Sequence, residues 1–129
     1  MRPTGIVLAA LALAACGGGG GSKTNDQRIV LAGSCTYAAQ ADQSDRACQS
    51  SSVPASSVDL VRAVKEAECN AQPTHAWTTG KCPDTGCLGC CSIDDQDGVR
   101  TTLCYYGSAY AGISASSCPA GAFWTTAPP

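Results

Sequence analysis

Three kinds of hydrophobic pattern follow one another along the chain. An unbroken apolar run covers Ile6–Ala15, valines recur at helical spacing near the middle, and short alternating runs occupy most of the remainder. The ten apolar residues of the first run are typical of a signal peptide and too few to span about 30 Å of hydrocarbon. The pattern therefore predicts an export signal over residues 1–15, followed by one folded region.

The valine repeat predicts one main helix at about Ser57–Cys69. Val58, Val61 and Val64 lie at intervals that place them near one another on a helix. Asp59 falls in the expected first turn, where the helix dipole favours an acidic side chain. A second, short helix is expected within Gly107–Ser117.

Short runs typical of β-strands flank the main helix. They lie at about Arg28–Tyr37, Ala76–Lys81, Leu88–Asp94, Val99–Tyr106 and Ala122–Thr126. Asp97-Gly98 predicts a hairpin turn between the third and fourth runs. Ala38–Ser52 is polar and is expected to be irregular. The elements together predict an α+β fold with a small antiparallel sheet.

Three features recur in the same order, which indicates an internal duplication. The order is Cys-x-Tyr, a helical stretch ending in Cys, and Trp-Thr-Thr. The members are Cys35 to Tyr37, Cys69 and Trp77 in the first unit, and Cys104 to Tyr106, Cys118 and Trp124 in the second. We interpret this as one strand–helix–strand unit used twice, with each terminal cysteine tying its helix to the sheet. The polar segment with Cys48 would then be an insertion.

The export signal ends in Leu13-Ala14-Ala15-Cys16, which resembles the lipobox of bacterial lipoproteins. The resemblance implies cleavage before Cys16 and acylation of its sulfur, and several acyl chains suffice for stable membrane anchoring. The alternative is an ordinary secretory signal cut near Ala15, with Cys16 as a structural thiol. Residues 16–27 read as the lipidated cysteine and a Gly-rich tether, and residues 28–129 as the cysteine-rich domain. The six residues of GGGGGS reach roughly 12–15 Å.

Residue 17 bears on the expected location. It is Gly17, whereas in the bacterial sorting pattern an Asp at this position retains the protein on the inner membrane. The resemblance to bacterial lipoproteins therefore favours the outer membrane of the cell envelope.

The second half of the chain resembles a family of small, cysteine-rich, uncharacterised bacterial lipoproteins. The shared motifs are a Trp-x-x-Gly-x-Cys-Pro segment from Trp77, a Gly-x-Cys strand at Gly89, Cys104-Tyr-Tyr, and a closing Cys118 and Trp124. The resemblance covers about Cys69 to Thr126 and implies no particular activity.

Ten cysteines in 129 residues indicate a domain stabilised by disulfides. Without Cys16, nine remain, so four disulfides and one free thiol are the simplest outcome. Cys48, alone in its polar segment, is the candidate free thiol. The disulfide candidates are Cys35, Cys69, Cys82, Cys87, Cys90, Cys91, Cys104 and Cys118. The sequence leaves their pairing open.

Four cysteines crowd into the segment from Cys82 to Cys91. Disulfides explain them best, and a zinc or iron–sulfur site and a thiol redox pair are the alternatives. Cys87-x-x-Cys90 resembles one knuckle of a zinc ribbon, but a matching second knuckle is missing. A redox pair would need a helix N-terminus in a thioredoxin-like setting. If the segment forms a strand, Cys90 and Cys91 point to opposite faces.

Other residues offer little for catalysis, and we predict no catalytic residue, metal or cofactor. The single histidine, His75, is expected in an exposed turn. Asp94–Gly98 lacks the ligand spacing of an EF-hand and is expected to be a solvated turn. The tyrosines and tryptophans are expected mainly in the core. With a formal net charge of -2, the chain has no basic patch for nucleic acid.

These observations predict a membrane-anchored lipoprotein with a non-catalytic structural or binding role at the cell envelope. Its membrane partner would be reached through Cys16, and its protein or ligand partner is left open. Two alternatives remain: a redox or metal-binding protein using Cys82 to Cys91, and an anchored inhibitor-like or toxin-like module.

Overall fold

The computed structural model describes residues 28–38 and 45–129. The strands are β1 (Ile29–Ala38), β2 (Arg46–Pro54), β3 (His75–Thr78), β4 (Cys87–Asp94), β5 (Arg100–Tyr106) and β6 (Phe123–Thr125). They form one six-stranded sheet in the order β3-β1-β2-β5-β4-β6, and every neighbouring pair is antiparallel.

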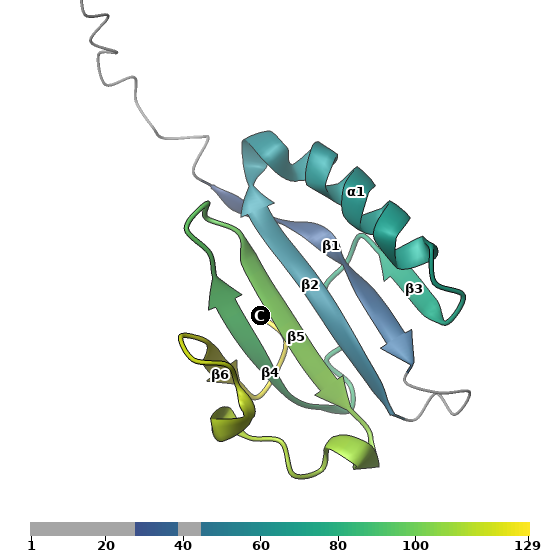
Figure 1. Cartoon of the computed structure of the whole chain (residues 1–129), viewed down its shortest axis with the longest axis vertical. Helices are drawn as coiled ribbons and strands as arrows, with labels where there is room; N and C mark the ends of the chain where they lie inside the picture. Colours follow the sequence, from purple (N-terminus) through teal and green to yellow (C-terminus); the bar gives the residue numbers. More distant parts are fainter. Residues whose placement is uncertain (1–27, 39–44) are drawn as a thin grey trace, which may run out of the picture.

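Helix α1 (Val58–Asn70) lies over the β1 and β3 side of the sheet (Figure 1). A 3-10 turn, η1 (Ala55–Ser57), precedes the helix. The second predicted helix takes the form of two short 3-10 turns, η2 (Ser108–Tyr110) and η3 (Ala115–Ser117). The predicted α+β class, the main helix and five of the strands are thus confirmed, with bounds that agree within one residue except at β3, which ends at Thr78 and not at the predicted Lys81.

The prediction for Ala38–Ser52 was wrong, because this segment contains most of β2, a central strand of the sheet. Its serines and alanine replace the branched apolar residues by which a strand is usually recognised. Ser50 and Ser51 are 6% and 5% exposed, so small hydroxyl side chains occupy positions close to the core. Cys48 therefore lies in the sheet, opposite Cys104, and not in an insertion.

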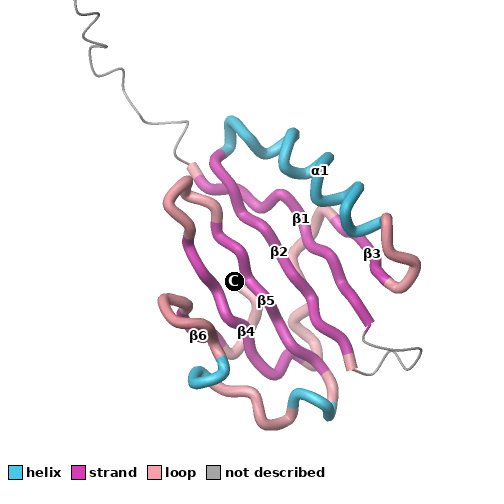
Figure 2. Tube along the Cα trace, in the orientation of Figure 1, coloured by secondary structure: helices cyan, strands magenta, loops and turns pink. Residues whose placement is uncertain are grey.

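The sheet consists of two equivalent halves related by an approximate two-fold axis. Strands β1, β2 and β3 of the first half correspond to β4, β5 and β6 of the second (Figure 2). One row of directly paired residues crosses the whole sheet and reads Trp77, Cys35, Gln49, Leu103, Cys91 and Trp124. The row is Trp-Cys from either end, so the axis passes between Gln49 and Leu103.

The register corrects the predicted duplication in one respect. Cys35 corresponds to Cys91 and not to Cys104, because Cys35 pairs with Trp77 as Cys91 pairs with Trp124. The cysteine link is confirmed, since the cysteine that ends each helical stretch is joined to the sheet in both halves. The predicted strand–helix–strand order was wrong, because two strands precede the helical stretch in each unit and one follows it.

A β-bulge occupies the same place in each half. The register of β1 shifts between Leu31 and Gly33, and that of β4 shifts between Cys87 and Gly89. In both halves the tryptophan of the adjacent edge strand lies against the bulge glycine, with a tryptophan ring atom 2.4 Å from the place of a Cβ at Gly33 and 2.0 Å at Gly89. Only glycine leaves room for this close approach.

The two faces of the sheet differ in what covers them. On one face, here called the covered face, residues 79–86 and the C-terminal tail lie over the strands. Ser34 donates to the Gly80 carbonyl, and Lys81 reaches the Pro128 carbonyl. The core on this side is built of sulfur and one aromatic ring: Cys48, Cys82, Cys90, Cys104 and Tyr106. The other face, here called the open face, carries the row from Trp77 to Trp124.

Candidate functional site

Four disulfides cross-link the described residues, and three of them join elements that are not consecutive in the chain. They are Cys35–Cys69, Cys48–Cys82, Cys90–Cys104 and Cys91–Cys118. Two of these connect the open face to helical segments, and two lie on the covered face. Cys90 and Cys91 thus point to opposite faces of β4, as the alternation of a strand predicts.

The identity of the free thiol is a correction. Cys48 is fully buried and bonded to Cys82, whereas Cys87 is the one cysteine of the described residues outside a disulfide. Cys48 lies on the covered face of a central strand, where residues 79–86 cross and bring Cys82 to it. Seven of the eight disulfide candidates are bonded, and Cys87 is the exception.

Cys87 lies beside a disulfide. Its Sγ is 3.6 Å from that of Cys90, which is bonded to Cys104. Tyr106 is directly opposite Cys87 on β5 and donates its hydroxyl to the Pro83 carbonyl at 2.6 Å. Burial, followed by the nearby Cys87, raises the pKa of Tyr106, so its phenol stays neutral beside the three sulfurs.

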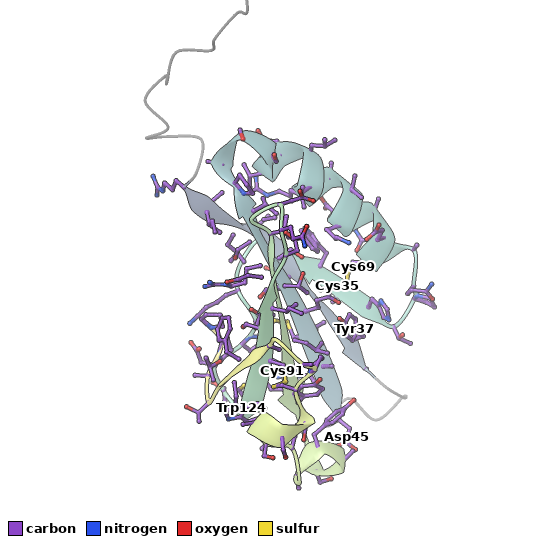
Figure 3. The ribbon with its side chains drawn as sticks, turned by 60° about the vertical axis from the view of Figure 1, so that its left-hand side comes forward. Cys35, Tyr37, Asp45, Cys69, Cys91 and Trp124 are labelled. Carbon is purple, nitrogen blue, oxygen red and sulfur yellow. A yellow bond between two sulfur atoms is a disulfide. The ribbon has the colours of Figure 1, made fainter. Side chains whose placement is uncertain are left out.

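The open face holds two adjoining pockets, one in each half of the sheet. The first has a volume of about 200 Å³ and lies between α1 and the strands β1, β2 and β3. Its walls are Cys35, Tyr37, Gln49, Ser51, Lys65, Glu68, Cys69, His75 and Trp77. Figure 3 shows Cys35, Cys69 and Tyr37 together beneath the helix.

The second pocket, of about 190 Å³, lies beyond the two-fold axis and is more apolar. Its walls are Gln49, Cys91, Ile93, Thr101, Leu103, Tyr105, Pro119 and Ala122. Gln49 borders both pockets, so they are neighbouring parts of one surface. The Cys91–Cys118 disulfide holds the segment that forms the outer wall.

The surface carries polar groups but no net formal charge. Lys65 and Glu68 form an ion pair at 2.8 Å, and the other residues around both pockets are uncharged when His75 is neutral. Burial, followed by the nearby Tyr105, raises the pKa of Tyr37 to about 12. Tyr37 therefore remains a neutral donor, and its hydroxyl donates to the side-chain amide oxygen (Oε1) of Gln49 at 2.7 Å.

Of the remaining candidates, His75 borders the first pocket and the turn at Asp94–Gly98 borders neither pocket. His75 is half-buried at the start of β3 and packs on Tyr37 at 4.9 Å, which corrects the expected exposed turn. Asp94–Gly98 is the predicted solvated turn, in which Asp95 accepts from Val99. The lipidation candidate Cys16 lies outside the described residues.

Two groups of side chains within the described residues have the proximity of metal ligands. One is Cys35, Cys69 and His75, and the other is Cys87, Cys90 and Cys104. Each group contains a disulfide, whose sulfurs carry no thiolate to bind a cation. As described, both groups are therefore poor sites for zinc.

The floor of the pockets was not predicted from the sequence. Gln49 and Ser51 lie on β2, the strand that was expected to be irregular. The signal that could have marked them is the two-residue period of a strand, which places Ala47, Gln49 and Ser51 on one face of β2 and Cys48 and Ser50 on the other.

Comparisons with protein families, curated proteins and solved structures find no match for this chain. Within residues 28–38 and 45–129, none of the helices has the length and apolar character needed to cross a bilayer.

Proposed function

We propose that this chain is a lipid-anchored, non-catalytic binding domain of the bacterial cell envelope, and that its open face binds an extended, uncharged polypeptide segment. The anchor rests on the lipobox at Cys16. The binding role rests on one observation: two small pockets adjoin on one face of the sheet, and in each half a disulfide fixes a helical segment beside the pocket.

The size of the pockets favours a ligand with several small groups. At about 200 and 190 Å³, each lies below the lower end of the range for drug-sized ligands, which is roughly 300 Å³. Each therefore suits one side chain, and a ligand that fills both must be extended across Gln49 and Leu103.

The chemistry of the walls favours an uncharged peptide. A charged ligand would find no counter-ion, because Lys65 and Glu68 neutralise each other. Leu103 and Ile93 offer an apolar contact in the second pocket, and Gln49 and Tyr37 offer polar contacts in the first. Tyrosine suits such a surface because it combines a rigid apolar ring with a hydrogen-bonding tip.

The test is selection of peptides from a library of random octamers on the folded protein. We expect enrichment of uncharged sequences, and NMR shifts that concentrate at residues 47–51 and 101–105 when a selected peptide is added. Leu103→Arg should weaken binding by at least about tenfold, or about 1.4 kcal/mol, because it places a charge at the centre of the surface.

Leu60→Arg is the matched control, because Leu60 is 72% exposed on α1 and borders neither pocket. Equal loss of affinity in both variants would contradict the proposed surface. So would shifts confined to other faces, or binding of a neutral oligosaccharide array in place of peptides.

A further inference from the structure

We propose that Cys87, Cys90 and Cys104 form a thiol–disulfide exchange site, in which the disulfide moves between Cys90–Cys104 and Cys87–Cys90. This activity is separate from peptide binding, because the three sulfurs lie on the covered face and border neither pocket. Cys87 is a thiol with a disulfide as its immediate neighbour.

The bulge in β4 creates the juxtaposition. Residues three apart in a regular strand point to opposite faces, so Cys87 and Cys90 would lie on different sides of the sheet. The extra residue at Leu88 shifts the register and turns Cys87 to the face of Cys90. The two Sγ atoms are 3.6 Å apart as a result, and all three sulfurs lie within 4.8 Å of one another.

The other half of the sheet shows that the fold does not require these sulfurs. By register, Leu31 corresponds to Cys87, Ser34 to Cys90 and Ser50 to Cys104. Ser34 and Ser50 pair across β1 and β2 as the two cysteines pair across β4 and β5. The same backbone, with the same bulge, therefore forms with one leucine and two serines, which leaves the sulfur triad to be explained by its chemistry.

The exchange balances without an external oxidant. The Cys87 thiol loses its proton, and the thiolate sulfur attacks the Cys90 sulfur to form a new S–S bond. The Cys90–Cys104 bond breaks, its electron pair remains on the Cys104 sulfur, and that thiolate takes up a proton. One thiol and one disulfide are present before and after.

The two states differ in the access of solvent to the thiol. Cys87 is half-buried at the start of β4, whereas Cys104 is fully buried. Exchange therefore withdraws the reactive thiol into the core and removes the covalent link between β4 and β5. A mixed disulfide between Cys87 and a small thiol would hold the domain in the Cys90–Cys104 state, because it removes the attacking group.

The experiment locates the free thiol in the full chain. The protein is incubated between pH 6 and pH 9, denatured in acid, and labelled at once with one alkylating reagent. The disulfides are then reduced and labelled with a second reagent. Trypsin cleaves after Lys81 and Arg100, which places Cys87 and Cys104 in different peptides and separates both from Cys16.

We expect the first label at both Cys87 and Cys104. The fraction of Cys104 that carries this label should reach its final value faster at higher pH, because the thiolate is the attacking species. Cys87→Leu, which copies Leu31, should lower the Cys104 label at least about tenfold, since it removes the nucleophile. In the unchanged chain, alkylation of native Cys87 before incubation should have the same effect, which covers the case of a variant that fails to fold.

Two results would overturn the proposal. One is that, at every pH and time, Cys104 carries no more of the first label in the unchanged chain than it does in Cys87→Leu. The other is comparable first label at Cys48, Cys82, Cys91 and Cys118, which would show general scrambling of the disulfides. Neither result bears on binding at the open face.

Discussion

At the scale of the residue, two glycines decide how the edge strands pack. Gly89 has φ +154° and lies under the ring of Trp124, as Gly33, with φ +151°, lies under Trp77. An indole ring packed on a bare backbone allows the edge strand to approach β4 closely. The repeated glycine–tryptophan contact is therefore part of the unit that was duplicated.

We predict that Gly89→Ala lowers the free energy of unfolding by at least about 2 kcal/mol. The added Cβ would come within 2.0 Å of Trp124, and both overpacking and an unfavourable φ cost about 1–3 kcal/mol each. Urea unfolding followed by tryptophan fluorescence measures the effect.

Gly112→Ala is the control, because Gly112 is exposed and a Cβ there meets no atom within 4 Å. Its effect should stay within about 0.5 kcal/mol. A loss at Gly89 no larger than this would contradict the close glycine–tryptophan contact.

At the scale of the element, helix α1 is attached to the sheet mainly by the Cys35–Cys69 disulfide, and less by burial of apolar side chains on one face of the helix. Cys69 is the only buried residue among Val58–Asn70, and Leu60 and Val64 are 72% and 46% exposed. The valine repeat correctly predicted that a helix forms. It did not predict how the helix is attached, because the attachment depends on the position of Cys35 on a different element.

We predict that the paired replacement Cys35→Ala and Cys69→Ala detaches α1 from the sheet. The lost disulfide closes a sequence separation of 34, for which loop entropy gives about 4 kcal/mol. Amide hydrogen exchange should show loss of protection across Val58–Asn70 before the sheet unfolds.

The paired replacement Cys91→Ala and Cys118→Ala is the matched control. It removes the equivalent disulfide of the other half, with a separation of 27, and leaves α1 attached. Similar loss of helix protection in both double variants would show that α1 is held by the sheet as a whole and not by its own disulfide.

Also at this scale, strand β2 shows the limit of pattern reading. Five strands were predicted from their branched and aromatic residues. In β2 the buried residues are alanine, cysteine and serine, apart from Val53 near the end of the strand. Small hydroxyl residues fit a sheet whose core is a thin layer of disulfides and hydrogen bonds, such as that between Ser92 and Thr102 at 2.7 Å. A core of this kind produces no periodic pattern of apolar residues, so the pattern could not predict β2.

At the scale of the whole molecule, the duplication explains both the sheet and its pockets. Two copies of one unit meet along β2 and β5, so each copy shields an edge of the other. The two-fold relation also brings two similar pockets together at Gln49 and Leu103. The halves differ in chemistry, since one holds a long helix and the other holds three neighbouring sulfurs.

The anchor is a prediction at this scale as well. We expect Cys16→Ser to release the protein from the membrane fraction or to leave the signal uncut, because the proposed lipobox makes Cys16 both the residue to be acylated and the first residue after cleavage. Fractionation of cells and the intact mass of the protein measure both outcomes. Cys87→Ser is the control and should leave retention unchanged, whereas full membrane retention and normal processing of Cys16→Ser would contradict lipidation.

The sequence by itself determined those properties that depend on neighbours along the chain. The helix, five strands, the Asp97-Gly98 turn, the opposite faces of Cys90 and Cys91, and the existence of a repeat all follow from local spacing. Tertiary structure alone decided the pairing of the cysteines, the free thiol at Cys87 and the identity of the pocket floor. These depend on which strands meet and on the bulge that turns Cys87 toward Cys90, and such contacts between distant segments leave no periodic signal in the sequence.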